Sequence, residues 1–114
     1  MSTTWEKFQG ATVSLARSGS IKDRLTDAYR NYLAAVAEEE LPREIREQFH
    51  LVRCSLTRER PLRGEDAIRA SVRKMSSHEA ENIAATVVQM LSVMARSPQA
   101  TRPSSATPLY LLEA

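Results

Sequence analysis

The sequence predicts an all-α protein, a compact bundle of four to five helices followed by an extended C-terminal tail rich in Pro, Ser and Thr. Apolar residues recur at steps of three and four positions through most of residues 1–96, and no segment alternates as a strand does. Capping and breaking residues separate the periodic stretches. The length of 114 residues fits one domain, so we expect a helical bundle domain at residues 1–96 and a tail at residues 97–114.

Five helices are expected, over residues 4–17, 21–38, 42–58, 65–74 and 77–95. Thr3 and Glu6 have the spacing of a capping box, in which each side chain accepts a hydrogen bond from the other residue's backbone N–H. Gly19 suits the left-handed conformation that closes a helix. Ser20 suits the capping position of the next helix, so the first two helices are expected to meet at a short turn.

Breaking and capping residues also mark the later helices. Pro61 disfavours helical backbone at the residue before it, and Gly64 is permissive, so we expect a break between the third and fourth helices. Ser76, or Ser77 one residue later, repeats the capping signal with Glu79. The fourth helix is therefore expected to be short.

The stretch expected to form the last helix is apolar over more than half of its circumference. We expect it to be the central and most buried helix. Its apolar surface exceeds what one small bundle covers, and an exposed apolar patch usually marks a partner site. Together with an apolar cluster near the C-terminus, the predicted partner-binding residues are Val88, Met90, Val93, Leu109, Tyr110, Leu111 and Leu112.

The tail poses two alternatives. Residues 97–107 carry prolines and almost no apolar bulk, so no helix is expected there. Residues 109–112 either dock in an apolar groove, on this chain or on a neighbouring copy, or fray as termini commonly do.

Arginine is concentrated between residues 43 and 74, where nine Lys or Arg face five Asp or Glu. The predicted basic patch comprises Arg53, Arg58, Arg60, Arg63, Arg69, Arg73 and Lys74. Such a patch fits nucleic acid or an acidic protein surface. The interleaved acids favour a solvated face with internal ion pairs instead, for example Glu47 with Arg43 or Arg46, and Glu65 with Arg69.

Metal and catalytic chemistry are not supported by the sequence. His50 and Cys54 are four residues apart and share a helix face, with Glu47 one turn earlier. A structural zinc site needs four ligands, and the other histidine, His78, lies on a different element, so no metal and no cofactor are predicted. Cys54 is expected to be a small core residue that packs rather than reacts. Without a phosphate loop or a nucleophile elbow, we expect no enzyme.

The function expected from these patterns is that of a small non-catalytic protein-interaction or regulatory module, with a homodimer as one form of the association. The alternative is sequence-independent nucleic-acid binding through residues 43–74. Helix-turn-helix reading is excluded because the last helix offers apolar residues where base-contacting ones are needed. The sequence shows no secretory signal, no membrane span and only one cysteine, which favours a cytoplasmic location and no membrane partner. A bacterial cell is expected from the general style of the sequence, and no single residue decides this.

Overall fold

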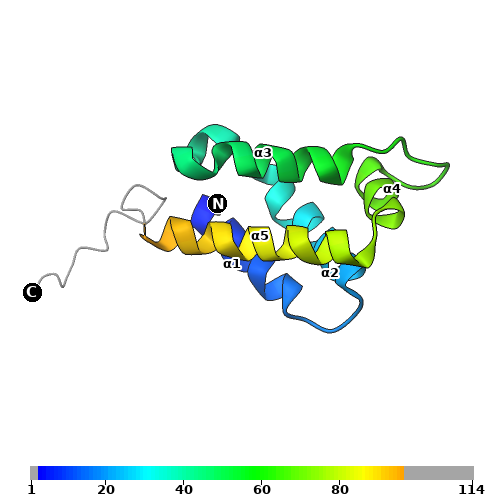
Figure 1. Ribbon diagram of the computed structural model, residues 1–114, viewed down its shortest axis with the longest axis horizontal. Helices are drawn as coiled ribbons and strands as arrows, with labels where there is room; N and C mark the ends of the chain where they lie inside the picture. Colours follow the sequence, from blue (N-terminus) through cyan, green and yellow to red (C-terminus); the bar gives the residue numbers. More distant parts are fainter. Residues whose placement is uncertain (1–2, 97–114) are drawn as a thin grey trace, which may run out of the picture.

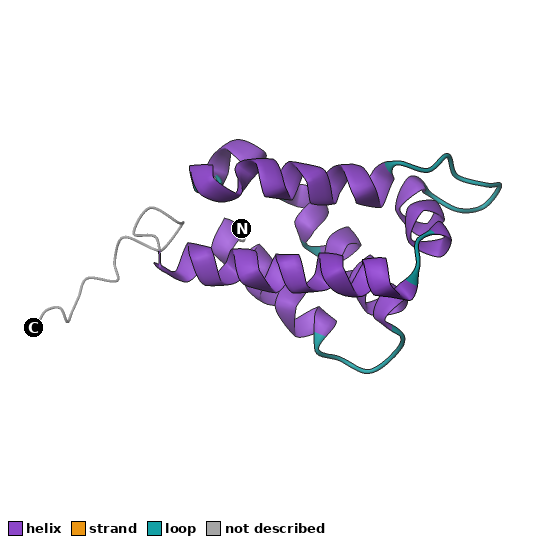
Figure 2. Cartoon of the chain, viewed as in Figure 1, coloured by secondary structure: helices purple, strands orange, loops and turns teal. Residues whose placement is uncertain are grey.

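The computed structural model describes residues 3–96, and within this range the chain forms five α-helices, two 3-10 turns and no strand (Figure 2). The all-α prediction is confirmed. The elements are α1 (Thr4–Leu15), α2 (Ile21–Asn31), η1 (Leu33–Ala35), η2 (Glu38–Glu40), α3 (Arg43–Thr57), α4 (Ala67–Lys74) and α5 (Ser77–Arg96). The predicted tail, including the apolar residues 109–112, lies outside the described residues.

The first turn of α1 forms the predicted capping box. The Thr3 hydroxyl accepts from the Glu6 N–H at 3.0 Å, and the Glu6 carboxylate accepts from the Thr3 N–H at 2.9 Å. The turn between α1 and α2 contains Gly19 at φ +112°, a conformation that side chains rarely adopt. Ser20 then caps α2 by accepting from the Asp23 N–H, so the expected turn is present.

The second helix is shorter than its apolar periodicity predicts. We expected helix over residues 21–38, but α2 ends at Asn31 and the chain continues in two 3-10 turns. A side chain from α3 binds the backbone beyond this end. Arg53 donates to the carbonyls of Leu33 and Val36, at 3.2 and 2.7 Å, so these carbonyls have a partner outside a continued helix.

The last two helices begin at their capping residues. Asp66 caps α4 by accepting from the Arg69 N–H at 2.9 Å, so this helix starts two residues later than predicted. Ser76 caps α5 by accepting from the Glu79 N–H at 3.0 Å. No helix within residues 3–96 is both long and apolar enough to cross a membrane.

The helices are arranged around α5, which runs along the length of the molecule (Figure 1). α3 lies on one side of α5 and runs in the opposite direction, while α1 and α2 pack on the other side. The short α4 closes one end, where it contacts α2 and α3. Phe8 of α1 and Phe49 of α3 meet in the centre, with ring centroids 5.7 Å apart. A single core therefore joins all five helices.

Candidate functional site

An open hollow of about 240 Å³ lies on the surface between α3 and α5. We call it the α3–α5 hollow; it is lined by Gln48, Leu51, Val52, Ser55, Ile83 and Thr86. These residues recur at three- and four-residue steps on each helix, so both helices present one continuous stripe to it. Leu51, at its edge, is 59% exposed. An apolar side chain of this size standing in solvent offers contact area to a partner.

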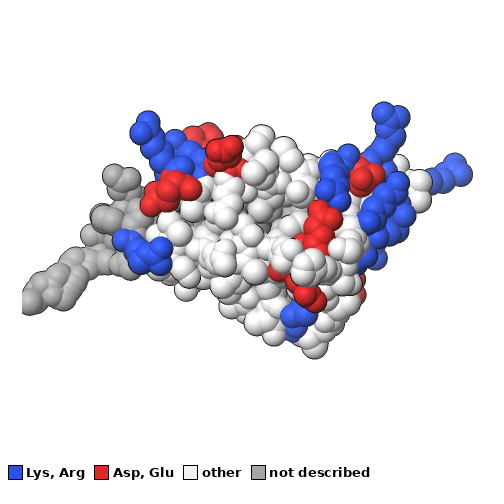
Figure 3. All heavy atoms as spheres, viewed as in Figure 1, with Lys and Arg blue, Asp and Glu red and all other residues white. Residues whose placement is uncertain are grey.

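The surface over α3 and α5 carries few charges. Figure 3 shows charged side chains at the two ends of the molecule and a broad uncharged area between them. The sequence explains this area, because α5 has no Asp, Glu, Lys or Arg between Glu81 and Arg96. On α3, only Arg53 is charged between Glu47 and Arg58, and its side chain is 27% exposed. The α3–α5 hollow thus opens onto a face suited to uncharged contacts.

The predicted apolar partner residues of α5 do not form one face. Met90 is 0% exposed and belongs to the core, which corrects its placement in an exposed patch. Val93 is partly buried against the core and follows Thr86 by two helical turns, on the side of the α3–α5 hollow. Val88 is 41% exposed but lies two residues from Thr86, which places it on the opposite side of α5.

Sequence reasoning missed Leu51 as a surface residue. Leu51 is exposed, and so is Cys54, so the prediction that Cys54 is a core residue is wrong. The buried stripe of their helix consists of Ile45, Phe49, Val52 and Leu56. Its spacing already marks Leu51 as a neighbour of the stripe rather than a member of it, and this is the signal that would have found the site.

Arg53 is a structural residue rather than part of a basic surface. Its Nε–H donates to the Tyr29 hydroxyl at 3.1 Å, and its guanidinium lies 4.8 Å from the centre of the Phe49 ring. Nη1 pairs with Glu38 at 3.3 Å, while Nη2 bonds the two carbonyls that follow α2. These contacts fix α3 to the segment between α2 and α3, and they leave little of the guanidinium for a ligand.

Other residues of the predicted basic patch are neutralised by neighbouring acids. Arg58 pairs with Glu79 at 3.2 Å, and Lys74 pairs with Glu59 at 3.5 Å. The sequence predicts an ion pair between Glu65 and Arg69, which are four residues apart. In the structure Glu65 instead binds Arg73, eight residues away, at 2.8 Å.

Three residues of the predicted patch have no carboxylate of residues 3–96 within 4.0 Å: Arg60, Arg63 and Arg69. All three are exposed, and they lie on the α3–α4 connection and on α4. Lys and Arg side chains gather at this end of the molecule in Figure 3, with acidic side chains between them. The predicted basic patch is therefore reduced to these three cations.

Two carboxylates at the start of α4 are held in their charged form. The hydrogen bond from Arg73, followed by that from the Leu62 N–H, lowers the pKa of Glu65 below its usual range. The Arg69 N–H and then Arg30 lower the pKa of Asp66 in the same way. Glu65 in turn raises the pKa of Arg73. The Arg30–Asp66 pair joins α2 to the start of α4, whereas the Glu65–Arg73 pair joins the α3–α4 connection to α4 itself.

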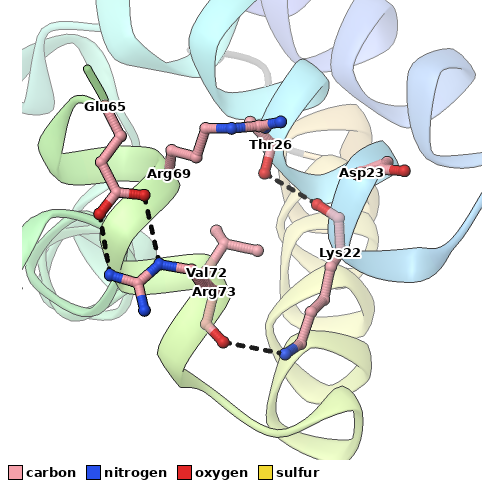
Figure 4. A pocket seen from close by; sticks show the side chains of 7 residues that line it. All are labelled: Lys22, Asp23, Thr26, Glu65, Arg69, Val72 and Arg73. Atoms are coloured by element: carbon pink, nitrogen blue, oxygen red, sulfur yellow. Dashed lines mark hydrogen bonds and ion pairs between the residues drawn. The ribbon is translucent and has the colours of Figure 1, made fainter. Parts of the chain in front are cut away.

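A second hollow, of about 220 Å³, lies between α2 and α4 (Figure 4). Its polar groups already bind one another. Arg73 binds Glu65, Lys22 Nζ donates to the Arg73 carbonyl at 3.2 Å, and the Thr26 hydroxyl donates to the Lys22 carbonyl. Within residues 3–96, two lining cations have no carboxylate partner: Lys22, whose Nζ binds a carbonyl, and Arg69. A site whose donors are already occupied offers little to a ligand.

His50 and Cys54 do share a face of α3, as their spacing predicts, and Glu38 rather than Glu47 completes the group. Glu38 contacts His50 Nδ1, whereas Cys54 contacts Nε2. The two ligands thus lie at different edges of the imidazole ring and cannot share one ion with it. Across residues 3–96, no three His, Cys, Asp or Glu side chains are placed to hold a metal ion.

Comparison of the chain with family models, with curated proteins and with solved structures finds no match.

Proposed function

We propose that this protein is a non-catalytic protein-interaction module that binds a short apolar peptide segment in the α3–α5 hollow. We further propose that the chain's own Leu109, Tyr110, Leu111 and Leu112, called here the terminal cluster, occupy the hollow until a partner segment of similar chemistry displaces them. The observation that carries the proposal is the exposed Leu51 beside a hollow in an uncharged face.

The size of the hollow favours side chains over a small-molecule ligand. Ligand pockets usually measure roughly 300–1,000 Å³, whereas this hollow measures about 240 Å³ and is open to solvent. Its walls combine Leu51, Val52 and Ile83 with the uncharged polar residues Gln48 and Thr86. Such walls suit one or two apolar side chains from a peptide, and they place no acid or base where a reaction needs one.

The length of the tail makes its own terminal cluster the first candidate occupant. α5 ends at Arg96, and retracing the helix from there to Thr86 covers roughly 15 Å at 1.5 Å per residue. A connecting chain as long as residues 97–108 has a root-mean-square reach of roughly 17–21 Å when unstructured. The terminal cluster therefore reaches the hollow, and tethering raises its local concentration to the millimolar range.

A labelled peptide of residues 108–114 tests the proposal directly. The core cluster of the described residues lies between Phe8 and Met94, so a chain ending at residue 107 keeps it intact. We expect the peptide to bind this shortened chain at micromolar concentration and to bind the full chain at least tenfold more weakly, because the tethered terminal cluster competes. Fluorescence anisotropy measures both affinities.

Two matched variants locate the binding surface. Leu51→Glu places a charge at the edge of the hollow and is expected to abolish peptide binding. Val13→Glu makes the same change at a residue that is 55% exposed on α1, and it is expected to leave binding unchanged. Equal effects of the two variants, or no binding to the shortened chain, would rule the proposal out. A full-chain dimer that dissociates on removal of residues 108–114 would place the terminal cluster in the hollow of a second copy.

The compartment that suits this module is the cytoplasm. Cys54 is a free, exposed thiol, and such thiols persist in reducing compartments.

A second candidate function is sequence-independent nucleic-acid binding, which the exposed Arg60, Arg63 and Arg69 favour. Three phosphate contacts would give a slope of about −2 to −3 for log K against log salt concentration. The test is retention of the full chain on a polyanion near physiological salt, with Arg60→Glu/Arg63→Glu as the variant. Retention that the variant abolishes supports this function, and no retention of the wild type removes it.

A further inference from the structure

A thiol, an imidazole and a carboxylate from two elements meet on the exposed side of α3. Cys54 Sγ lies 3.5 Å from His50 Nε2, and His50 Nδ1 lies 3.1 Å from Glu38 Oε2. Cys54 is exposed, and the His50 side chain is 56% exposed. We propose that Cys54 is a reactive thiol, activated by His50 and Glu38, and that low-molecular-weight disulfides are the compounds that modify it.

The imidazole lies between the thiol and the carboxylate, which is the arrangement that activation of a thiol requires. When the Nδ1–H of His50 donates to the Glu38 carboxylate, Nε2 is left with a free lone pair directed at the Cys54 thiol. Nε2 can then take the thiol proton. The resulting imidazolium is stabilised by the negative charge of Glu38 on its other side. A nucleophile, a base and a group that orients the base are thus in contact.

The carboxylate is held in place by Arg53. Arg53 Nη1 lies 3.3 Å from the same Oε2 atom of Glu38 that His50 contacts. The same guanidinium binds the carbonyls of Leu33 and Val36 in the segment that leads to Glu38. Glu38, 30% exposed, is therefore fixed beside α3 rather than free to move with a surface loop.

The chemistry available to this group is thiol–disulfide exchange. The Cys54 proton passes to His50 Nε2, and the thiolate attacks one sulfur of the disulfide. The S–S bond of the compound breaks as a new S–S bond to Cys54 forms, so Cys54 is oxidised and the released half is reduced. The departing thiolate takes the proton from His50. Since the sequence has one cysteine, no second thiol of the same chain resolves the mixed disulfide, which lasts until an external thiol attacks it.

Two other reactions of a thiol are less suited to this place. Acyl transfer needs free N–H donors for an oxyanion, and Cys54 lies inside α3, where the helix itself uses the backbone N–H groups. Metal binding is opposed by the opposite positions of Cys54 and Glu38 around the ring. Disulfide exchange needs neither an oxyanion site nor a metal, only an accessible thiolate.

The test compares the rate at which the full chain reacts with an aromatic disulfide that releases a coloured thiol. Because His50 is placed to take the thiol proton, we expect the folded wild type to react about 10-fold faster than the same chain unfolded in guanidinium chloride, where this contact is lost. His50→Ala is expected to lower the folded rate to the unfolded one, and added imidazole to restore part of it. Oxidised glutathione is expected to add one glutathione to Cys54, read by mass spectrometry.

Glu38 is tested as a residue that acts through His50. Glu38→Gln is expected to slow the reaction about threefold in the wild type and to have no effect in the His50→Ala background, because the base it orients is then missing. His78→Ala removes a histidine on α5 and serves as the matched control, with no expected change. A wild type that reacts no faster than its unfolded chain, or a His50→Ala variant that reacts as the wild type does, would overturn the proposal.

Discussion

The two sides of α5 are packed differently. On the side of α1 and α2, Phe8, Ala11, Leu25 and Ala28 are all 0% exposed. On the side of α3, the helices leave a hollow of about 240 Å³, and Leu51 stands in solvent beside it. Both sides are built from amphipathic helices, so amphipathicity alone does not decide how closely two helices approach.

The two sides also differ in the residues at their contacts. Small residues let α1 and α2 come close to each other. At Gly10 of α1 the approach is so close that an added Cβ would collide with the ring of Tyr32, which follows α2. The buried stripe of α3 consists of larger residues, Ile45, Phe49, Val52 and Leu56.

The largest expected effect is a difference in unfolding free energy between two leucine variants, one on each side of α5. Leu25→Ala removes a fully buried side chain on the close-packed side and should cost about 2–5 kcal/mol of unfolding free energy. Leu51→Ala on the open side should cost at most about 0.5 kcal/mol, because the side chain is 59% exposed. Urea unfolding of both variants measures the two costs, and equal costs would contradict the difference between the sides.

The second largest effect on stability is expected from substitutions that enlarge a side chain. Gly10→Ala forces the Tyr32 ring to move and should destabilise the fold by about 1–3 kcal/mol. Thr86→Leu adds bulk at the wall of the α3–α5 hollow, where there is room, and should change stability by at most about 0.5 kcal/mol. Thermal unfolding compares the two. A cost for Thr86→Leu as large as that for Gly10→Ala would show that the hollow is not open.

Arg53→Lys tests whether the hydrogen bonds of Arg53 hold α3 against the segment that follows α2. Lysine keeps the charge but loses the planar fork that bonds two carbonyls and Tyr29 at once, so we expect a loss of about 1–2 kcal/mol. Arg43→Lys is the control and should have no measurable effect, because Arg43 is exposed on the same helix and forms no ion pair with the described residues 3–96. If both variants are equally stable, packing rather than Arg53 holds α3.

The smallest expected effect is a dependence of the unfolding free energy on pH. The folded chain lowers the pKa of Asp66 and of Glu65, so each stabilises the fold above its unfolded pKa, about 4. That stabilisation is lost as the pH falls through the lower folded pKa values. Asp66→Asn should therefore reduce stability at neutral pH and weaken its decline between about pH 5 and pH 2. Unfolding titrations across this range measure the slope, and an unchanged slope in the variant would contradict the assignment.

Local features of the fold could be predicted from the sequence, and features that depend on distant residues could not. The caps Thr3, Ser20 and Ser76 are correct because a cap needs only residues three positions away. The end of α2 was predicted seven residues late, at 38 instead of 31. Arg53, which binds the backbone beyond this end, lies twenty positions from Leu33 in the sequence.

The candidate sites were harder to predict for a similar reason. Met90 and Leu51 both belong to apolar stretches, and only the rotation of each helix against its neighbours decides that Met90 is buried and Leu51 exposed. The His50–Cys54 spacing was visible in the sequence, but Glu38 reaches His50 from another element. No local pattern announces such a contact, since it depends on how η2 lies against α3.

The bonds of Arg53 also impose an order on assembly. The carbonyls of Leu33 and Val36 receive hydrogen bonds from a side chain on α3, so the turns between α2 and α3 stay incomplete until α3 has docked. The closing loops are short, which makes this docking entropically cheap. Residues 33–41 should therefore open and close together with α3 as one cooperative unit in native-state hydrogen exchange, separately from α2, although they directly continue α2 along the chain.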